Sequence, residues 1–101
     1  MNTLTIIVPC FNEADVLVDF ISTVNLQTHE LPLIKKYLLI NDGSTDDTLD
    51  IMKNLSETFD NIFYLSFSRN FGKEAAMSAA LDIVQADAIV PIDVDLQDPP
   101  E

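Results

Sequence analysis

The sequence predicts an α/β fold in which a doubly wound, mostly parallel sheet carries helices on both faces. Two observations predict it. Short β-branched runs alternate with segments whose apolar residues recur at helical spacing, and the connections between them are short. Parallel strands joined through helices take right-handed connections, which gives the element order βαβαβαβ. The 101 residues, 48% of them hydrophobic, are enough for one small domain with one core.

The strands are expected where β-branched and aromatic residues cluster. The first run is halted by Pro9 and is apolar throughout, as a strand buried on both faces would be. Pro91 lies within the fourth run, and a proline there indicates an edge strand, a bulge or an early strand end. We predict the strand order 3-2-1-4, with strands over residues 4–8, 37–40, 62–65 and 88–92.

Helices are expected between these strands. Asn12 can cap a first helix over residues 13–25, and Ser44 or Thr45 can cap a second helix. A third helix follows the loop that ends at Gly72. The apolar faces are Val16, Leu17, Phe20, Ile21 and Val24 in the first, Leu49, Met52, Leu55 and Phe59 in the second, and Ala76, Met77, Ala80, Leu81 and Val84 in the third.

Charge and composition exclude several classes of function. The net charge is −12, with 17 acidic residues against five Lys and Arg, and such a surface repels nucleic acid and anionic lipid. A single cysteine, Cys10, fits a reducing compartment. We see no signal peptide and no apolar run of membrane length, so we expect a soluble cytoplasmic chain. The abrupt stop at Glu101 suggests a fragment truncated at its C-terminus.

Polar residues follow each expected strand, and the carboxyl ends of parallel strands share one edge of the sheet, where ligands bind in open α/β folds. After the fourth strand, Asp93, Asp95 and Gln97 alternate and can face one spot in extended chain. Two carboxylates and an amide oxygen suit Mg²⁺ or Mn²⁺, which would bridge to a diphosphate. The alternative is a solvated acidic turn. The other residues after strands are Pro9, Asn12 and Glu13, then Asn41, Asp42, Gly43 and Ser44, then Arg69, Asn70, Gly72 and Lys73.

Each remaining candidate also has a structural alternative. Asp42 can accept from a base edge such as the N3–H of uracil, or it can simply form a turn. Glu13 can touch a nucleotide or complement a helix dipole. Arg69 and Lys73 can hold a diphosphate, or they can be an ordinary surface pair. Cys10 is interpreted as a packed residue, because no base is evident near it. The two glycines cannot form a G-x-G-x-x-G or a Walker A loop.

Four segments together resemble the family-two inverting glycosyltransferases of the GT-A fold, in the right order and across the whole chain. The last two look most like the polyprenyl-phosphate glycosyltransferases, a group that includes bactoprenol glucosyltransferases and, more distantly, dolichol-phosphate mannose synthases. The segments are Ile-Val-Pro-Cys-Phe-Asn-Glu at 7–13, Asn-Asp-Gly-Ser-Thr-Asp-Asp-Thr at 41–48, Ser-Arg-Asn-Phe-Gly-Lys-Glu-Ala at 68–75 and Asp-Val-Asp-Leu-Gln-Asp-Pro-Pro-Glu at 93–101.

The resemblance implies a function and roles for residues. A hexose would move with inversion from a nucleoside-diphosphate sugar, UDP-glucose-like, to a polyprenyl phosphate, assisted by Mg²⁺ or Mn²⁺. The 101 residues would be the N-terminal nucleotide-binding part of a GT-A domain, with catalytic residues outside it, and the full-length protein would act at the cytoplasmic face of a membrane. Pro9, Asn12, Glu13, Asp42 and Asp93 would bind the nucleotide, and Asp93, Asp95 and Gln97 would hold the metal.

Two rival hypotheses remain open. A non-catalytic nucleotide-binding module would keep Asp42 but would not need Asp93 and Asp95, and a purely structural α/β domain would need none of them. Metal-dependent nucleotide binding separates the three. An exposed edge on the fourth strand also predicts self-association through residues 88–96, although Pro91 removes one backbone donor there.

Overall fold

The computed structural model describes residues 3–30, 32–84, 88–92 and 94. Strands and helices alternate from β1 to β4, as expected. The first three strands extend two residues beyond their expected carboxyl ends, whereas the fourth ends one residue before its expected end. The elements are β1 (Thr3–Cys10), α1 (Leu17–Gln27), β2 (Ile34–Asp42), α2 (Thr48–Thr58), β3 (Ile62–Phe67), α3 (Lys73–Ile83) and β4 (Ala88–Pro91).

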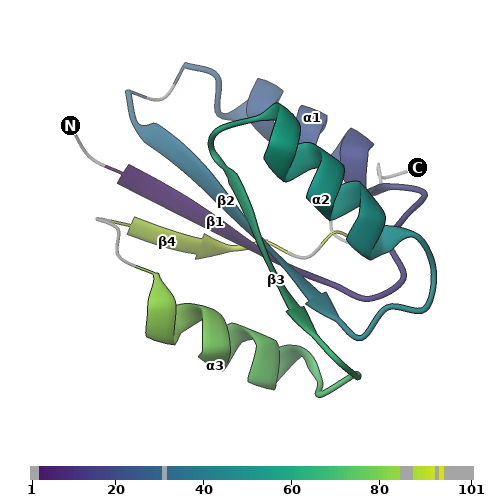
Figure 1. Ribbon diagram of the computed structural model, residues 1–101. Coiled ribbons are helices and arrows are strands. Elements are labelled where there is room, and N and C mark those ends of the chain that lie inside the picture. Colours follow the sequence, from purple (N-terminus) through teal and green to yellow (C-terminus); the bar gives the residue numbers. More distant parts are fainter. Residues whose placement is uncertain (1–2, 31, 85–87, 93, 95–101) are drawn as a thin grey trace, which may run out of the picture.

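The four strands form one parallel sheet in the order β3-β2-β1-β4, which confirms the predicted class and strand order (Figure 1). β1 and β2 occupy the centre, and β3 and β4 lie outside them. The longest pairing joins β1 and β2, from Thr3 opposite Ile34 to Cys10 opposite Asn41. The carboxyl ends of β1 and β2 therefore end side by side.

Helices cover both faces of the sheet, which makes it doubly wound (Figure 1). α1 and α2 lie on one face over the larger core cluster, to which β1 and β2 contribute alternate residues such as Ile6, Val8 and Leu39. α3 lies on the other face, where Ala76 and Ala80 pack against Ile7, Leu38 and Ile40. The small side chains of α3 allow its backbone to approach the sheet closely.

The prediction that Pro9 halts the first strand is wrong, because β1 runs on to Cys10. The Ile92 N–H donates to the Ile7 carbonyl at 3.0 Å, so Ile7 directs its backbone groups toward β4. Pro9, two residues on, directs its nitrogen to the same side, beyond the last β1–β4 pair at Pro91. The missing donor at Pro9 therefore breaks no bond to β2.

The predicted starts of the first two helices are also wrong, whereas the third helix begins directly after Gly72, as expected. α1 begins at Leu17 rather than at residue 13, and Asn12 does not cap it. α2 begins at Thr48, with Asp47 and not Ser44 or Thr45 at the N-cap position. The polar side chains before each helix instead bond across to the neighbouring loop. Phe59, expected on the buried face of α2, follows the helix and is 49% exposed.

β4 pairs with β1 alone among the described strands, as an edge strand would, and it ends at Pro91. Self-association through residues 88–96 stays a prediction. Residues 93, 95 and 96 of this segment lie outside the described residues. Within the part of the chain that the structure describes, every helix is too short and too polar to cross a bilayer.

Replacing Leu39 by Ala should lower the free energy of unfolding by about 2–5 kcal/mol, because this side chain is fully buried in the central strand. Leu26→Ala is the matched control, since Leu26 on α1 is 79% exposed and its truncation should cost less than about 0.5 kcal/mol. Urea unfolding followed by circular dichroism measures both. Equal losses would contradict the assigned core.

Candidate functional site

Three loops meet at the carboxyl end of the sheet, where ligands bind in open α/β folds. The first loop (residues 11–16) follows β1, the second loop (residues 43–47) follows β2, and the third loop (residues 68–72) follows β3. Because the strand order is β3-β2-β1, the second loop lies between the other two. Hydrogen bonds join the second loop to the first loop, and Asp42 at the end of β2 accepts hydrogen bonds from the third loop. We call the three loops, held together in this way, the rim.

Asn12 joins the first loop to the second. Its backbone takes the left-handed conformation, with φ of 55°, which asparagine tolerates better than most residues. Its Oδ1 accepts the N–H of Thr45 at 2.7 Å and that of Asp46 at 3.3 Å, and its own N–H donates to Ser44 Oγ at 2.9 Å. The side chain that was predicted to cap α1 therefore accepts hydrogen bonds from the second loop instead.

Thr48 makes a second connection between these loops. Its hydroxyl is fully buried, accepts the Glu13 N–H at 2.9 Å and donates to the Asp46 carboxylate. Asp46 also accepts the N–H of Ala14 at 3.2 Å and that of Thr48 at 3.0 Å. Desolvation raises the pKa of Asp46, but the hydrogen bonds from Thr48 and Ala14 prevail and hold that pKa below its ordinary value.

The polar end of β2 is buried. Asn41 is 3% exposed, and its Oδ1 accepts the Ser44 N–H at 3.0 Å while its Nδ2 donates to Ser66 Oγ at 3.1 Å. Asp42 is 4% exposed, and its two oxygens accept the N–H groups of Phe71 at 2.8 Å and Gly72 at 3.0 Å. Among the described residues, every buried side-chain nitrogen and oxygen has a hydrogen-bond partner.

The third loop carries Arg69 onto the rim. Its guanidinium lies over the ring of Phe71, with the central carbon 4.6 Å from the ring centroid. Phe71 meets Phe67 edge to face, with ring centroids 5.5 Å apart. This stacking favours one orientation of the otherwise flexible Arg69 side chain. Lys73, the other predicted diphosphate ligand, begins α3, and its side chain lies outside what the structure describes.

The remaining nucleotide candidates lie near the first loop. Pro9 is buried in β1, and Glu13 is partly exposed beside the second loop. Burial raises the pKa of Cys10, and the negative charge of Glu13 raises it further. The thiol of Cys10 therefore stays protonated at neutral pH, which confirms its interpretation as a packed residue rather than a nucleophile.

The predicted metal ligands, Asp93, Asp95 and Gln97, lie outside the described residues. Val94, between the two aspartates in sequence, is buried in the larger core cluster. Within the described ranges, no three His, Cys, Asp or Glu side chains gather into a group that could hold a metal. The metal site therefore stays a prediction.

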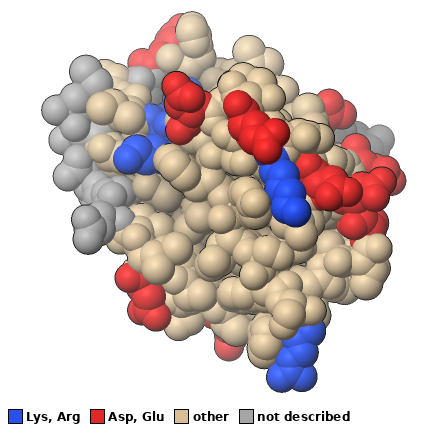
Figure 2. All heavy atoms as spheres, viewed as in Figure 1, with Lys and Arg blue, Asp and Glu red and all other residues tan. Residues whose placement is uncertain are grey.

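Charge is distributed unevenly on the surface. Figure 2 shows acidic side chains gathered at the right-hand side of this face, where the second loop leads into α2 in Figure 1, with few basic side chains between them. An anionic ligand approaching this side of the rim meets a negative field, which a bound cation would reduce.

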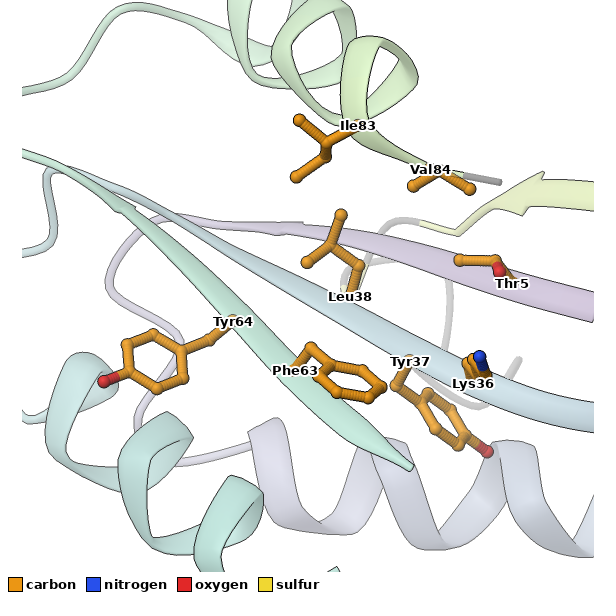
Figure 3. A pocket seen from close by; sticks show the side chains of 8 residues that line it. All are labelled: Thr5, Lys36, Tyr37, Leu38, Phe63, Tyr64, Ile83 and Val84. Carbon is orange, nitrogen blue, oxygen red and sulfur yellow. The ribbon is translucent and has the colours of Figure 1, made fainter. Parts of the chain in front are cut away.

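A hollow of about 440 Å³ lies away from the rim, between the end of α3 and the first halves of the strands (Figure 3). Leu38 points toward Ile83 across it. None of the residues that line this hollow belongs to the predicted nucleotide site. The hollow is therefore not interpreted as the nucleotide site. The lining residues are Thr5, Lys36, Tyr37, Leu38, Phe63, Tyr64, Ile83 and Val84.

Sequence reasoning missed Thr48 and the partners of Asn12. One feature of the sequence could have indicated these contacts, namely the run of five hydroxyl and carboxylate residues at 44–48. A helix cap uses only one such side chain, so the others were available to bond to another loop. The structure brings Asn12 to the second loop and Asp42 to the third, but it does not test contact of either residue with a nucleotide.

Thr48→Val should lower the free energy of unfolding by about 1–3 kcal/mol, because valine keeps the shape but removes the acceptor of the Glu13 N–H. Thr48→Ser keeps the hydroxyl and is the matched control. Urea unfolding of both variants measures the difference. A serine variant as unstable as the valine variant would show that packing, not the hydrogen bond, matters there.

Acidification should remove the contribution of Asp46 to stability. Since the folded-state pKa lies below the ordinary 3.8, the contribution is fully present above about pH 5 and is lost as the pH falls through the folded-state value. Unfolding free energies of wild type and Asp46→Asn, measured at pH 6 and pH 3, should differ more at pH 6. A gap that widens at pH 3 would contradict the assigned direction.

Comparison with known proteins agrees with the fold and the motifs. The model of glycosyl transferase family 2 matches residues 5–101. Bactoprenol glucosyl transferase of Shigella phage SfV is 44% identical over 98 residues, which are 97% of this chain and 32% of that protein. The putative glycosyltransferase CsbB of Bacillus subtilis is 40% identical over 95% of this chain and 29% of its own length. The chain thus spans about a third of the length of the curated relatives it matches.

Solved structures show the same architecture. The mannosyltransferase PcManGT of Pyrobaculum calidifontis, in complex with GDP-Man and Mn²⁺, superimposes with a TM-score of 0.79 at 24% identity over 93% of this chain and 28% of that one. Mannosyl-3-phosphoglycerate synthase of Rubrobacter xylanophilus gives 0.75 at 24% identity, over 98% of this chain and 32% of that one. These neighbours share the GT-A fold. Since the family model covers nearly all of the sequence, this chain belongs to glycosyl transferase family 2.

Proposed function

We propose that this chain is the nucleotide-binding part of an inverting glycosyltransferase, which moves a hexose from a nucleoside-diphosphate sugar to a polyprenyl phosphate. The observation that carries the proposal is the match of almost the whole chain, at 44% identity, to relatives named bactoprenol glucosyl transferase. The full reaction belongs to a longer protein like those relatives, acting at the cytoplasmic face of a membrane. The chain described here supplies donor binding.

The donor nucleotide sits on the rim formed by the three loops. Pro9, Asn12, Glu13 and Asp42 surround the nucleoside, and Arg69 lies on the third loop toward the diphosphate. The uridine form is favoured, because the bactoprenol relatives are named for glucose transfer. A solved structure of TarS from S. aureus contains UDP. It superimposes on this chain with a TM-score of 0.76 at 21% identity, over 92% of this chain and 27% of that one.

A divalent cation, Mg²⁺ or Mn²⁺, completes the site. The donor set of Asp93, Asp95 and Gln97 offers two carboxylates and an amide oxygen, which hard cations prefer. Val94, which lies between the two aspartates in sequence, is buried in the larger core cluster. When bound, the cation would neutralise negative charge on the diphosphate. It would thereby also reduce the repulsion between the diphosphate and the acidic surface near the rim.

The acceptor phosphate is already ionised, so little base catalysis is needed. One of its oxygens forms the new bond to the anomeric carbon, the bond from that carbon to the diphosphate breaks, and the nucleoside diphosphate leaves. A single displacement of this kind inverts the anomeric configuration. Positioning and electrostatic stabilisation supply most of the lowering of the barrier.

UDP should bind the chain more tightly with Mn²⁺ than without it, and Asp95→Asn should remove most of that dependence by deleting an anionic ligand. Asp82→Asn, an exposed acid on α3, is the matched control and should bind like wild type. Isothermal titration calorimetry measures all three. Equal affinity with and without metal would count against the metal site and favour a non-catalytic module. Tight GDP binding without a uridine preference would move the proposal to mannose transfer.

A further inference from the structure

The first loop is held at consecutive backbone positions by side chains from the second loop and from the first residue of α2. The N–H groups of residues 12, 13 and 14 each donate to a side-chain oxygen. In that order, the acceptors are Ser44 Oγ at 2.9 Å, Thr48 Oγ1 at 2.9 Å and Asp46 Oδ2 at 3.2 Å. Each bond joins residues more than thirty positions apart in the sequence. We call these three bonds the clasp.

Thr48 is the buried acceptor of the clasp, whereas Ser44 is half-buried and Asp46 is exposed. The Thr48 hydroxyl donates its one proton to the Asp46 carboxylate, which leaves the lone pairs of its oxygen to accept the Glu13 N–H. Because a carboxylate is a strong acceptor, this bond fixes the direction of the hydroxyl. Water does not readily replace a hydrogen bond in a buried place. Removal of the Thr48 hydroxyl therefore frees the Glu13 backbone to move.

The clasp acts on the part of the first loop that is predicted to bind the nucleoside. Asn12 has a φ of 55°, which is unfavourable for most residues other than glycine, and clasp bonds at Asn12 and Glu13 hold the backbone there. The Glu13 carbonyl in turn accepts the N–H of Val16 at 3.1 Å and that of Leu17 at 3.0 Å, where α1 begins. The position of Glu13 thus determines both the shape of the loop and its entry into the helix.

From this geometry we infer that Thr48 is a positioning residue, whose hydroxyl holds the first loop in the conformation that binds the nucleoside. This inference rests on the proposed function. Thr48 is 0% exposed, so it acts through the loop rather than by touching a ligand. A loop held in advance lowers the ordering cost of binding. The clasp serves the nucleoside end of the ligand, whereas Arg69, the diphosphate candidate, is oriented by Phe71 in the third loop.

Amide hydrogen exchange tests the clasp without any ligand. In the wild-type chain, the Glu13 and Ala14 amides should be protected although they lie in a loop. Thr48→Val should speed exchange at Glu13 by about tenfold or more, because it removes the acceptor, and Thr48→Ser should restore protection. The matched control is Thr58→Val, which removes an exposed hydroxyl at the other end of α2 and should change neither rate. If Thr48→Val is too unstable, Asp46→Asn changes an exposed side chain and should speed exchange at Ala14.

Titrations with UDP and with pyrophosphate, each with Mn²⁺, test the link to binding under conditions in which circular dichroism shows every variant folded. Thr48→Val should weaken UDP binding by about tenfold and leave pyrophosphate binding unchanged, because only UDP carries a nucleoside. Thr48→Ser and Thr58→Val should bind both ligands like wild type. A role in stability alone would lower the unfolding free energy without separating the two ligands.

Each other outcome overturns a distinct part. Unprotected wild-type amides at 13 and 14, or exchange at Glu13 that Thr48→Val leaves unchanged, would refute the clasp. Faster exchange with unchanged UDP affinity, or with equal losses for UDP and pyrophosphate, would refute the positioning role. A wild-type chain that binds neither ligand would refute the proposed function and the nucleoside half of this inference, while exchange still decides the clasp.

Discussion

Burial of the polar carboxyl end of β2 obliges the neighbouring loops to supply hydrogen bonds to it. Asn41 and Asp42 are almost fully enclosed, and unpaired polar groups in such a place are costly. Their partners come from the second loop, from the end of β3 and from the third loop. The first loop is joined in turn through Asn12 and Thr48. One buried strand end thus fixes the conformation of three loops.

A rim held in this way suits the binding of a charged, flexible ligand. Loops that are ordered before binding do not have to be ordered by the ligand, so more of the interaction energy appears as affinity. Orientation of a donor sugar also depends on such rigidity, because small displacements of reacting groups slow transfer. The acidic surface beside the rim opposes a diphosphate, and a cation and Arg69 are the groups that can offset this repulsion.

Much of the fold followed from the sequence, because the alternation of β-branched runs and helical apolar faces is a strong and local signal. The parallel order 3-2-1-4 was predicted and confirmed. The starts of α1 and α2 were predicted wrongly, because Asn12 bonds to residues more than thirty positions away instead of to its own helix. The partners of Asp42, 29 and 30 positions away, are equally invisible to local patterns. The metal ligands remain predictions from sequence alone.

The central claim, that the carboxyl-end rim binds a metal-bound nucleotide, is tested most directly by paramagnetic relaxation. Amide resonances of the ¹⁵N-labelled chain would be recorded with UDP and substoichiometric Mn²⁺, with Mg²⁺ as the diamagnetic reference. The account predicts the strongest broadening near Asp93 and Asp95 and in the first, second and third loops. Thr5, Lys36 and Phe63, which line the hollow away from the rim, should broaden least. Broadening centred on those three residues, or spread evenly over the acidic surface, would contradict the account.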